Sequence, residues 1–322
     1  MIRNILIFEP WNLGDLIIAT NFARFLNREF GMRIWFICKP LWIEWLLSEN
    51  FIEDVYAFEA PWTRIRGKYN PFNYKIKEIY KLSGYIKQVN PELIWDVRGD
   101  IRQKLFLKAI TKKRIYSPKY PKNINVYERL SFFVRDNIGI TNVQNFKYPE
   151  FENAKSIGVI TIFIDSAWPN KRVPPQKAYE LITNLLYSGY FVKLIIPPDK
   201  DYEFAKELIS NFPDKIILLK NSVVKIADEI KNSDLVISTD SGWLHMAYYY
   251  GVPRIGLFGF DNHLEWAPPG TKVILADKYL SKESRYKIKN MYLTPLESLD
   301  IKKVISEIEN IKQSVGMGTN LS

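Results

Sequence analysis

SDLVISTDSGWLHMAYYYGVPRIGLFG, residues 233–259, contains a strand, a tight turn and a helix in quick succession. The apolar run LVIS predicts a buried strand, and an apolar helix follows after only four residues. That turn, Thr239-Asp240-Ser241-Gly242, brings hydroxyls, a glycine and the first N–H groups of a helix to the carboxyl end of the strand. Such a turn can bind a phosphate, because N–H groups point at its oxygens. Asp-Ser-Gly is equally common in helix caps, and a histidine such as His245 is usually a packed or capping residue, so both interpretations stay open.

A similar unit lies near the start of the chain, in FEPWNLGDLIIATNFARFLN, residues 8–27. A short apolar strand precedes it, and its own apolar residues recur at helical spacing. Asp15 therefore stands at the beginning of a predicted helix. It is either an N-cap or first-turn carboxylate, which the helix dipole favours, or a general base at the mouth of a cleft.

Apolar strand-like runs alternate with helix-period segments along the whole chain. In the first half we expect strands at 3–8, 33–37, 54–58, 92–97 and 113–116, and helices at 15–29, 40–49, 73–89, 100–110 and 126–138. In the second half we expect strands at 157–164, 191–196, 215–219, 234–238 and 254–258, and helices at 175–188, 200–211, 222–231, 241–249 and 297–313.

This alternation predicts an α/β fold with two Rossmann-like, doubly wound parallel sheets that face a central cleft. Periodicity lapses at 144–156, so we expect an N-terminal domain over 1–150 and a C-terminal domain over 151–296. Residues 297–322 are expected to form a C-terminal helix and a disordered tail, and residues 60–74 a loop.

Composition narrows the class of protein. The 322 residues are 47% hydrophobic and 25% charged, as in a globular protein, and each apolar run is shorter than the roughly 20 residues that span a bilayer. We expect no signal peptide and no transmembrane helix. A single cysteine, Cys38, excludes an internal disulfide, and two histidines argue against a His-rich metal site. We therefore expect a cytoplasmic protein.

The net charge of +10 is unevenly placed, with +9 on residues 1–150 and +1 on residues 151–322. The first half is expected to meet an anionic partner, although a solvated lysine-rich surface is the simpler alternative. Nucleic acid is not expected, because the chain lacks helix-turn-helix, RRM and zinc-finger signatures. An anionic membrane surface fits better, since PLWIEWLLSENF (40–51) adds tryptophans to a short amphipathic helix.

These stretches resemble glycosyltransferase family 9, the lipopolysaccharide heptosyltransferases and their relatives, which have the GT-B fold. Residues 240–259 match the family pattern D-[TS]-G-x-x-H-x-A-x-x-x-x-x-P-x-x-x-L-F-G. Residues 13–15 match the L-G-D that ends the first loop of the family. WPNKRVPPQKAYELI (168–182) is similar to the K-R-W-P segment, and IWDVRGDIRQKLFLKAI (94–110) takes the place of D-x-x-G-x-x-[RK]-S.

The resemblance implies that Asp15 is the catalytic base. It implies a site for the donor diphosphate at Lys171, Asp240, Ser241, Gly242 and His245, and a weaker match places Asp201 near the donor nucleoside. For the acceptor we expect contacts from Asn12, Gly14, Arg64, Arg66, Arg98 and Arg102. Asp199-Lys200-Asp201 spells the D-x-D that binds metal in other glycosyltransferases, but it opens a predicted helix, so we expect no metal and no cofactor.

The chain departs from the family at Glu9-Pro10-Trp11-Asn12, at Arg98 and Asp100, and at Val173. These departures affect the acceptor and donor pockets more than the type of reaction.

The implied function is an inverting, metal-independent transfer of a heptose-like sugar from a nucleotide-diphosphate sugar, similar to ADP-heptose. An anionic saccharide or lipid-linked saccharide would accept it during lipopolysaccharide synthesis, with peripheral contact at the inner face of the cytoplasmic membrane. Two alternatives stay open: a catalytically silent protein that binds nucleotide sugars, and a sugar-nucleotide epimerase of the GT-B type.

Overall fold

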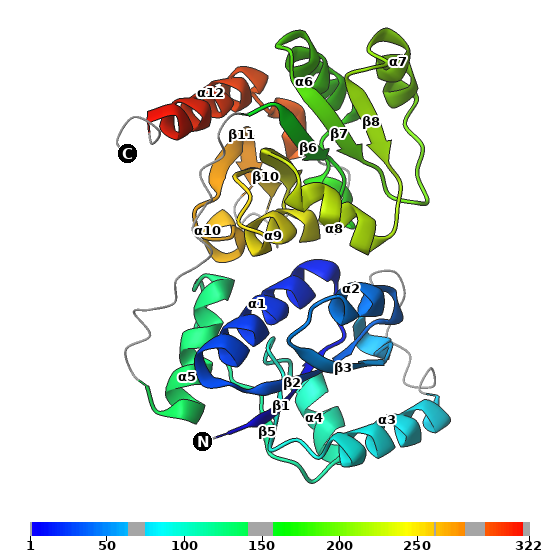
Figure 1. Cartoon of the computed structure of the whole chain (residues 1–322), viewed down its shortest axis with the longest axis vertical. Coiled ribbons are helices and arrows are strands. Elements are labelled where there is room, and N and C mark those ends of the chain that lie inside the picture. Colours follow the sequence, from blue (N-terminus) through cyan, green and yellow to red (C-terminus); the bar gives the residue numbers. More distant parts are fainter. Residues whose placement is uncertain (1, 64–74, 141–156, 261, 281–293, 318–322) are drawn as a thin grey trace. The chain divides into compact units, whose positions relative to one another are not determined.

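The computed structural model describes residues 2–63, 75–140, 157–260, 262–280 and 294–317. The chain divides into two compact units, Met1–Phe146 and Lys147–Ser322 (Figure 1). The expected linker at 144–156 and most of the expected loop at 60–74 lie outside the described residues. Each unit is an α/β layer structure on one parallel sheet, which confirms the expected α/β class with two parallel sheets.

Unit 1 is built on a parallel sheet of order β3-β2-β1-β4-β5. Its strands are β1 (Asn4–Glu9), β2 (Arg33–Cys38), β3 (Ile52–Ala57), β4 (Leu93–Trp95) and β5 (Ile115–Tyr116). Its helices are α1 (Leu13–Phe30), α2 (Ile43–Leu47), α3 (Ile76–Val89), α4 (Ile101–Ile110) and α5 (Arg129–Ile138), with short 3-10 turns at Pro40–Trp42, Pro61–Thr63 and Val126–Glu128.

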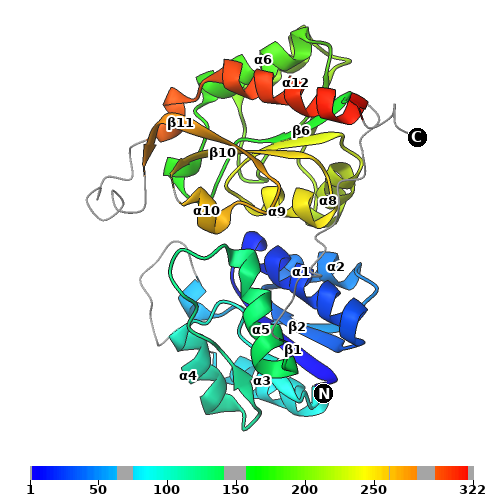
Figure 2. The ribbon, with the colours of Figure 1, turned by 90° about the vertical axis from the view of Figure 1, so that its left-hand side faces the viewer.

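Helices cover both faces of this sheet, as Figure 2 shows for α1 and α5 against α3 and α4. On the first face, Trp95 of β4 stacks on Phe22 of α1 and on Phe133 of α5, with ring centroids 5.7 and 4.1 Å apart. On the second face, Phe8 of β1 belongs to a buried cluster that includes Leu82, Ile86 and Leu107 of α3 and α4. Two apolar faces on one parallel sheet are the reason that the inner strands β1, β2 and β4 read as nearly continuous apolar runs.

Unit 2 is built on a parallel sheet of order β11-β10-β9-β6-β7-β8. Its strands are β6 (Val159–Phe163), β7 (Phe191–Ile195), β8 (Ile216–Leu219), β9 (Leu235–Thr239), β10 (Arg254–Phe260) and β11 (Lys272–Leu280). Its helices are α6 (Pro175–Tyr187), α7 (Glu203–Asn211), α8 (Val223–Lys231), α9 (Gly242–Tyr249), α10 (His263–Trp266) and α12 (Ile301–Met317), with 3-10 turns at Pro169–Lys171 and Pro295–Ser298.

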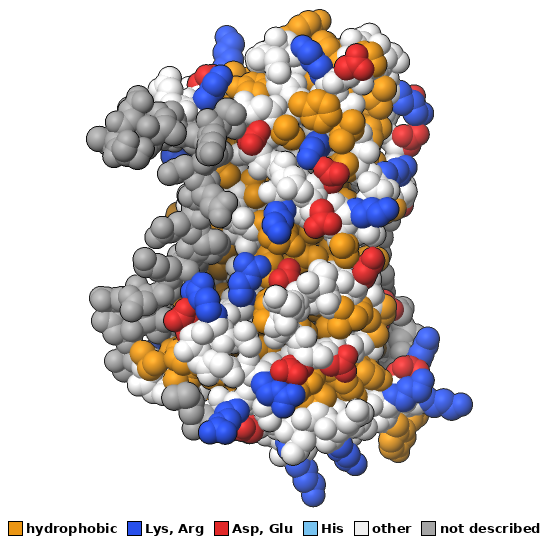
Figure 3. Space-filling view, in the orientation of Figure 1, with side chains coloured by type: hydrophobic (Ala, Val, Ile, Leu, Met, Phe, Trp, Pro, Cys, Tyr) orange, Lys and Arg blue, Asp and Glu red, His pale blue; other side chains and the backbone are white. Residues whose placement is uncertain are grey.

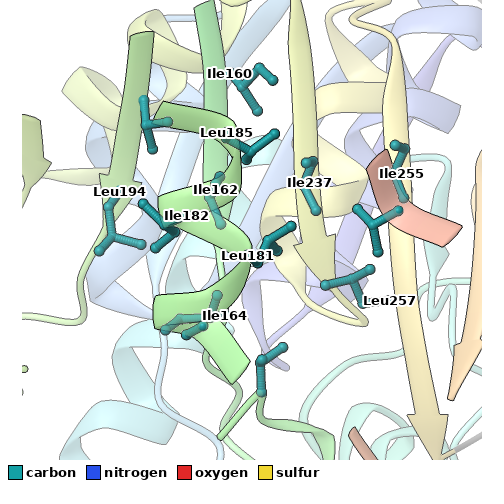
Figure 4. Close-up of a cluster of buried hydrophobic side chains, with 14 of the residues drawn as sticks. Ile160, Ile162, Ile164, Leu181, Ile182, Leu185, Leu194, Ile237, Ile255 and Leu257 are labelled. Atoms are coloured by element: carbon teal, nitrogen blue, oxygen red, sulfur yellow. The ribbon is translucent and has the colours of Figure 1, made fainter. Parts of the chain in front are cut away.

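The core of unit 2 lies between its sheet and the helices α6 and α12. Figure 4 shows Leu181, Ile182 and Leu185 of α6 directed at isoleucines of β6, β9 and β10. The last helix contributes Ile301, Val304, Ile308 and Ile311 to the same core, so it is an integral part of unit 2. On the face of unit 2 drawn in Figure 3, acidic and basic side chains are interspersed, in keeping with the near-zero charge of this half.

Some expectations for secondary structure were wrong in detail. The edge strand β11 was missed, because it pairs only with β10 and its outer positions carry charged residues such as Lys272 and Asp277. The helix expected at 40–49 is a 3-10 turn followed by the five residues of α2. The helix expected from residue 200 begins at Glu203, and the expected tail is helical as far as Met317.

The amphipathic segment at 40–51 also differs from its expected form. Trp45 is fully buried and Trp42 is partly buried, so neither tryptophan forms an exposed apolar face. Leu41 and Leu47 are the exposed large apolar residues of this segment, at 69% and 55%. Trp45 belongs to the short helix α2, which packs against β3.

Candidate functional site

In unit 2, the junction of β9 and α9 has the form that the sequence predicts. Ser241 is the N-cap of α9 in extended backbone conformation, and its hydroxyl lies 2.9 Å from that of Ser238. The Thr239 hydroxyl donates to the carbonyl of Asp165 at 2.5 Å, which ties β9 to the end of β6. The amino terminus of α9, which begins at Gly242, is thereby anchored at the carboxyl edge of the sheet. The N–H groups of its first residues and its dipole favour an anion there.

Lys171 and Asp240 meet at this edge. The ammonium group of Lys171 lies 2.5 Å from Oδ2 of Asp240, and both side chains are largely buried. A carboxylate repels a diphosphate, so Asp240 can favour diphosphate binding only by positioning Lys171. The structure brings these two predicted residues together, 69 positions apart in the chain.

Asp165, which the sequence analysis missed, organises a second charged group at the same edge. Its carboxylate contacts Arg172 Nε at 2.8 Å and Lys200 Nζ at 2.5 Å, and it accepts a hydrogen bond from the Tyr202 hydroxyl at 2.5 Å. Burial alone would raise the pKa of Asp165, but the bonds from Lys200 and Tyr202 lower that pKa below its ordinary value. The one available signal was its place directly after an apolar strand.

The two remaining predicted residues of unit 2 are Asp201 and His245. The Asp201 side chain is 62% exposed and forms an ion pair with Lys206 at 3.0 Å, which lowers the pKa of Asp201. It does not cap α7, whose N-cap is Tyr202. His245 is buried within α9.

In unit 1, Asp15 lies in the first turn of α1 but is not its cap. The N-cap is Asn12, and the Asp15 side chain instead accepts a hydrogen bond from Arg98 at 3.1 Å. Asp15 is 15% exposed and Arg98 35% exposed. Of the two carboxylate oxygens, only Oδ1 is bonded to a described residue. The contribution of Asp15 to helix capping is therefore limited to its charge near the dipole.

The residues expected to bind the acceptor have different surroundings. Arg98 stacks over the ring of Trp11, with its guanidinium carbon 4.1 Å from the centroid, and Arg102 lies 5.4 Å from the same ring. Arg102 is also paired with Asp100, which is the N-cap of α4. The side-chain oxygen of Asn12 accepts from Lys39 at 3.1 Å. Gly14 lies in the first turn of α1, whereas Arg64 and Arg66 are outside the described residues.

Asp96 builds the loop that carries Arg98. This buried carboxylate accepts hydrogen bonds from the Ser117 hydroxyl at 2.7 Å, the Gly99 N–H at 3.1 Å and the Gln103 amide at 2.5 Å. Burial outweighs these bonds and raises the pKa of Asp96 to about 6. Gly99 has a φ of +71°, and a Cβ atom there would clash with the carbonyl oxygen of Pro118, so only glycine fits.

Glu9 is a buried acid at the end of β1 that the sequence analysis noted only as a departure from the family. Its Oε1 atom has no hydrogen-bond partner among the described residues. Burial raises the pKa of Glu9 well above the ordinary value, and the nearby charges of Asp15 and Asp96 raise it further against the opposing effect of Arg98 and Arg129. Burial therefore favours the neutral form of the Glu9 carboxyl group.

Two further features are absent from the described part of the chain. No group of three or more His, Cys, Asp or Glu side chains is arranged there to hold a metal ion. Within those residues, no helix combines the length and the apolar character needed to cross a bilayer.

Comparison with known proteins indicates similarity to one family. The model of glycosyltransferase family 9 (heptosyltransferase) matches residues 139–292. A curated relative, lipopolysaccharide heptosyltransferase 1 of Campylobacter coli, is 22% identical over 354 aligned positions, covering 92% of this chain and 96% of the relative. These matches confirm the resemblance to family 9 and indicate a glycosyltransferase.

Solved structures agree on the fold. A glycosyl transferase of family 9 from Veillonella parvula is 17% identical with a TM-score of 0.71, covering 97% of each chain. The Escherichia coli heptosyltransferase WaaC with ADP is 16% identical with a TM-score of 0.71, covering 96% of this chain and 99% of that one. The same enzyme with ADP-2-deoxy-2-fluoro heptose is 17% identical with a TM-score of 0.70, covering 95% of this chain and 99% of that one. The chain therefore has a fold of the GT-B type, to which each unit contributes one parallel sheet.

Proposed function

From the premise that this chain is a glycosyltransferase of the family 9 type, we propose that it transfers a heptose-like sugar from a nucleotide-diphosphate sugar to a saccharide or lipid-linked saccharide. The reaction requires a base for the acceptor hydroxyl and a stabilised diphosphate leaving group. The observation that carries the proposal is Asp15, a carboxylate at the start of α1 that caps nothing and has one oxygen without a partner among the described residues.

Asp15 is proposed as the general base. Its Oδ2 atom accepts the proton of the acceptor hydroxyl while the oxygen attacks the anomeric carbon. Attack in line with the leaving diphosphate inverts the configuration at that carbon. General base catalysis of this kind contributes about 10²–10⁴-fold to the rate.

The diphosphate is proposed to bind at the start of α9. The N–H groups after Ser241 and Gly242, the ammonium of Lys171 and the imidazole of His245 would share its negative charge, and Asp240 would orient Lys171. A hydrogen bond that involves a charged group contributes about 1.5–3 kcal/mol. Several such bonds can take the place of a divalent ion, so we propose a metal-independent reaction without a cofactor.

The proposed donor is ADP-heptose or a close analogue, because solved structures of similar fold hold ADP and an ADP-heptose analogue. The proposed acceptor is anionic, since residues 1–150 carry a net charge of +9. A lipid-linked acceptor in lipopolysaccharide synthesis would place the protein at the inner face of the cytoplasmic membrane, where Leu41 and Leu47 offer a small apolar contact.

A transfer assay tests this proposal. Incubation with ADP-heptose and a lipopolysaccharide-core acceptor should release ADP and lengthen the acceptor, and ADP release should require the acceptor. Release of free nucleotide at the full rate without any acceptor would identify an epimerase or hydrolase instead. Binding of ADP-heptose with no turnover in the presence of acceptor would identify a silent binding protein.

A further inference from the structure

Three side chains from two separate segments contact one another in unit 1, with Arg98 in the middle. Trp11 lies between β1 and α1, Asp15 in the first turn of α1, and Arg98 in the loop between β4 and α4. The Arg98 guanidinium is 4.1 Å from the Trp11 ring centroid and donates through Nη1 to Asp15 Oδ1 at 3.1 Å. The contact with the aromatic face and the charged hydrogen bond together restrict where the guanidinium can lie.

The backbone beneath Arg98 is equally well fixed. Asp96 binds the Gly99 N–H, the Gln103 amide and the Ser117 hydroxyl, so the loop is closed on both sides of Arg98. Trp11 is almost completely buried and cannot move away from the guanidinium without leaving its cluster. Arg98 therefore donates to Asp15 from a loop and against a ring that are both held by contacts of their own.

We propose that Arg98, clamped on Trp11, is a positioning residue that holds the Asp15 carboxylate with Oδ1 occupied and Oδ2 presented to the acceptor hydroxyl. This inference rests on the proposed role of Asp15 as base, and it assigns Arg98 to the base rather than to the acceptor. Without the clamp, the carboxylate can rotate about its side-chain bonds, and the N–H groups in the first turn of α1 compete for it. A displacement of about 1 Å in a reacting group can cost about 100-fold in rate.

Kinetics of single variants give the first test. Arg98→Met should lower kcat about 10- to 100-fold and leave the acceptor KM within about twofold. Arg98→Lys should restore only part of the loss, because a lysine has no planar face for the ring. Trp11→Leu should repeat the effect of Arg98→Met, and Trp11→Phe, which keeps an aromatic face, should be close to wild type. An acceptor KM that rises at unchanged kcat would overturn the proposal and assign Arg98 to acceptor binding.

A double-mutant cycle gives the second test. If Arg98 acts through Asp15, then Arg98→Met should cause no further loss of kcat in an Asp15→Asn background. An unchanged loss in that background would overturn the proposal. Near-normal kcat in Asp15→Asn itself would instead refute the proposed base, so the two failures are distinguishable.

Arg33 offers a matched control within the same unit. Its guanidinium carbon lies 5.0 Å from the centroid of the Trp35 ring, and its side chain pairs with Glu53 at 3.0 Å. Arg33 is the first residue of β2, so this arrangement lies at the amino end of the strands, whereas Asp15 follows the carboxyl end of β1. Arg33→Met therefore disrupts a similar arrangement of arginine, tryptophan and carboxylate at a place remote from Asp15. Its kcat should equal that of wild type, and melting temperatures of all variants should show that each is folded. An equal loss of kcat in Arg33→Met would mean that loss of any such clamp impairs the unit, which would overturn the proposal.

Discussion

Lys171 and Asp240 form a largely buried ion pair, with the ammonium nitrogen 2.5 Å from the carboxylate oxygen. The pair joins the 3-10 turn after β6 to the turn after β9, so it connects two strands that are neighbours in the sheet. Its consequence for the proposed donor site is that the lysine is already ordered and needs little rearrangement to meet a phosphate.

Lys171→Ala should weaken the binding of ADP by about 1.5–3 kcal/mol, the value of one charged hydrogen bond, and should hardly change the binding of adenosine. ADP binding should lose more affinity than adenosine binding, because the variant also leaves the Asp240 carboxylate without its counter-ion, and that carboxylate repels the phosphates. Calorimetry with both ligands measures the difference, and Lys177→Ala, a partly exposed lysine of α6 that pairs with Glu180, is the control. Equal losses for ADP and adenosine would remove Lys171 from the phosphate site.

Asp15→Asn should lower turnover about 10²–10⁴-fold, because an amide keeps the shape of the side chain but cannot accept the proton. Donor affinity and melting temperature should change little, since Asp15 makes no capping hydrogen bond and the cap of α1 is Asn12. Steady-state kinetics and thermal unfolding measure these quantities. A nearly normal kcat in this variant would refute the role of Asp15 as base and leave it only the electrostatic effect of its charge at the start of α1.

Chelation should leave the activity intact, because the proposed site assigns the leaving-group charge to α9, Lys171 and His245. Transfer rates measured with and without EDTA check this expectation. Loss of activity on chelation with recovery on addition of magnesium or manganese would contradict it. Asp199 and Asp201 would then again be candidate ligands of a metal ion.

Glu9→Gln should stabilise the protein at high pH relative to wild type. Burial raises the folded-state pKa of Glu9, so the folded state retains a proton that the unfolded chain releases. The stabilising effect of that proton is complete below the unfolded pKa and is lost as pH rises through the folded pKa. Each pH unit between the unfolded and folded pKa values corresponds to about 1.4 kcal/mol of unfolding free energy.

Thermal unfolding of wild type and Glu9→Gln between pH 4 and pH 9 measures this difference. The two melting temperatures should be closest at the acid end, with the variant gaining as pH rises. Glu53→Gln is the contrasting control, because Arg33 lowers the pKa of Glu53 and the sign is reversed. A constant difference between wild type and Glu9→Gln at all pH values would show that Glu9 titrates normally.

Gly99→Ala should destabilise unit 1 by about 2 kcal/mol or more, because its Cβ would clash with the Pro118 carbonyl oxygen and its φ is +71°. Gly139→Ala is the control: its φ is +82° but its Cβ would have no neighbour within 4 Å. Denaturant unfolding should show a cost of about 1 kcal/mol for the control. Equal costs at both positions would mean that the loop yields to the clash.

The sequence by itself determined the class of fold and the position of Asp15. Apolar runs alternating with helical segments reflect strands buried on both faces, and this is a local property of each segment. The turn from residue 239 to residue 242 could be assigned for the same reason, since a strand end, a glycine and a helix start are neighbours in the chain. The order of these segments, matched to family motifs, also indicated the glycosyltransferase class.

Tertiary structure alone decided which charged side chains meet. Arg98 and Asp15 are 83 residues apart, and Lys171 and Asp240 are 69 apart. Such pairs depend on the order of strands in the sheet, which places β4 beside β1 and β9 beside β6, and local periodicity contains no information about that order. The buried partners Trp11, Asp165 and Glu9 escaped assignment for the same physical reason: their roles come from neighbours that the folded sheet supplies.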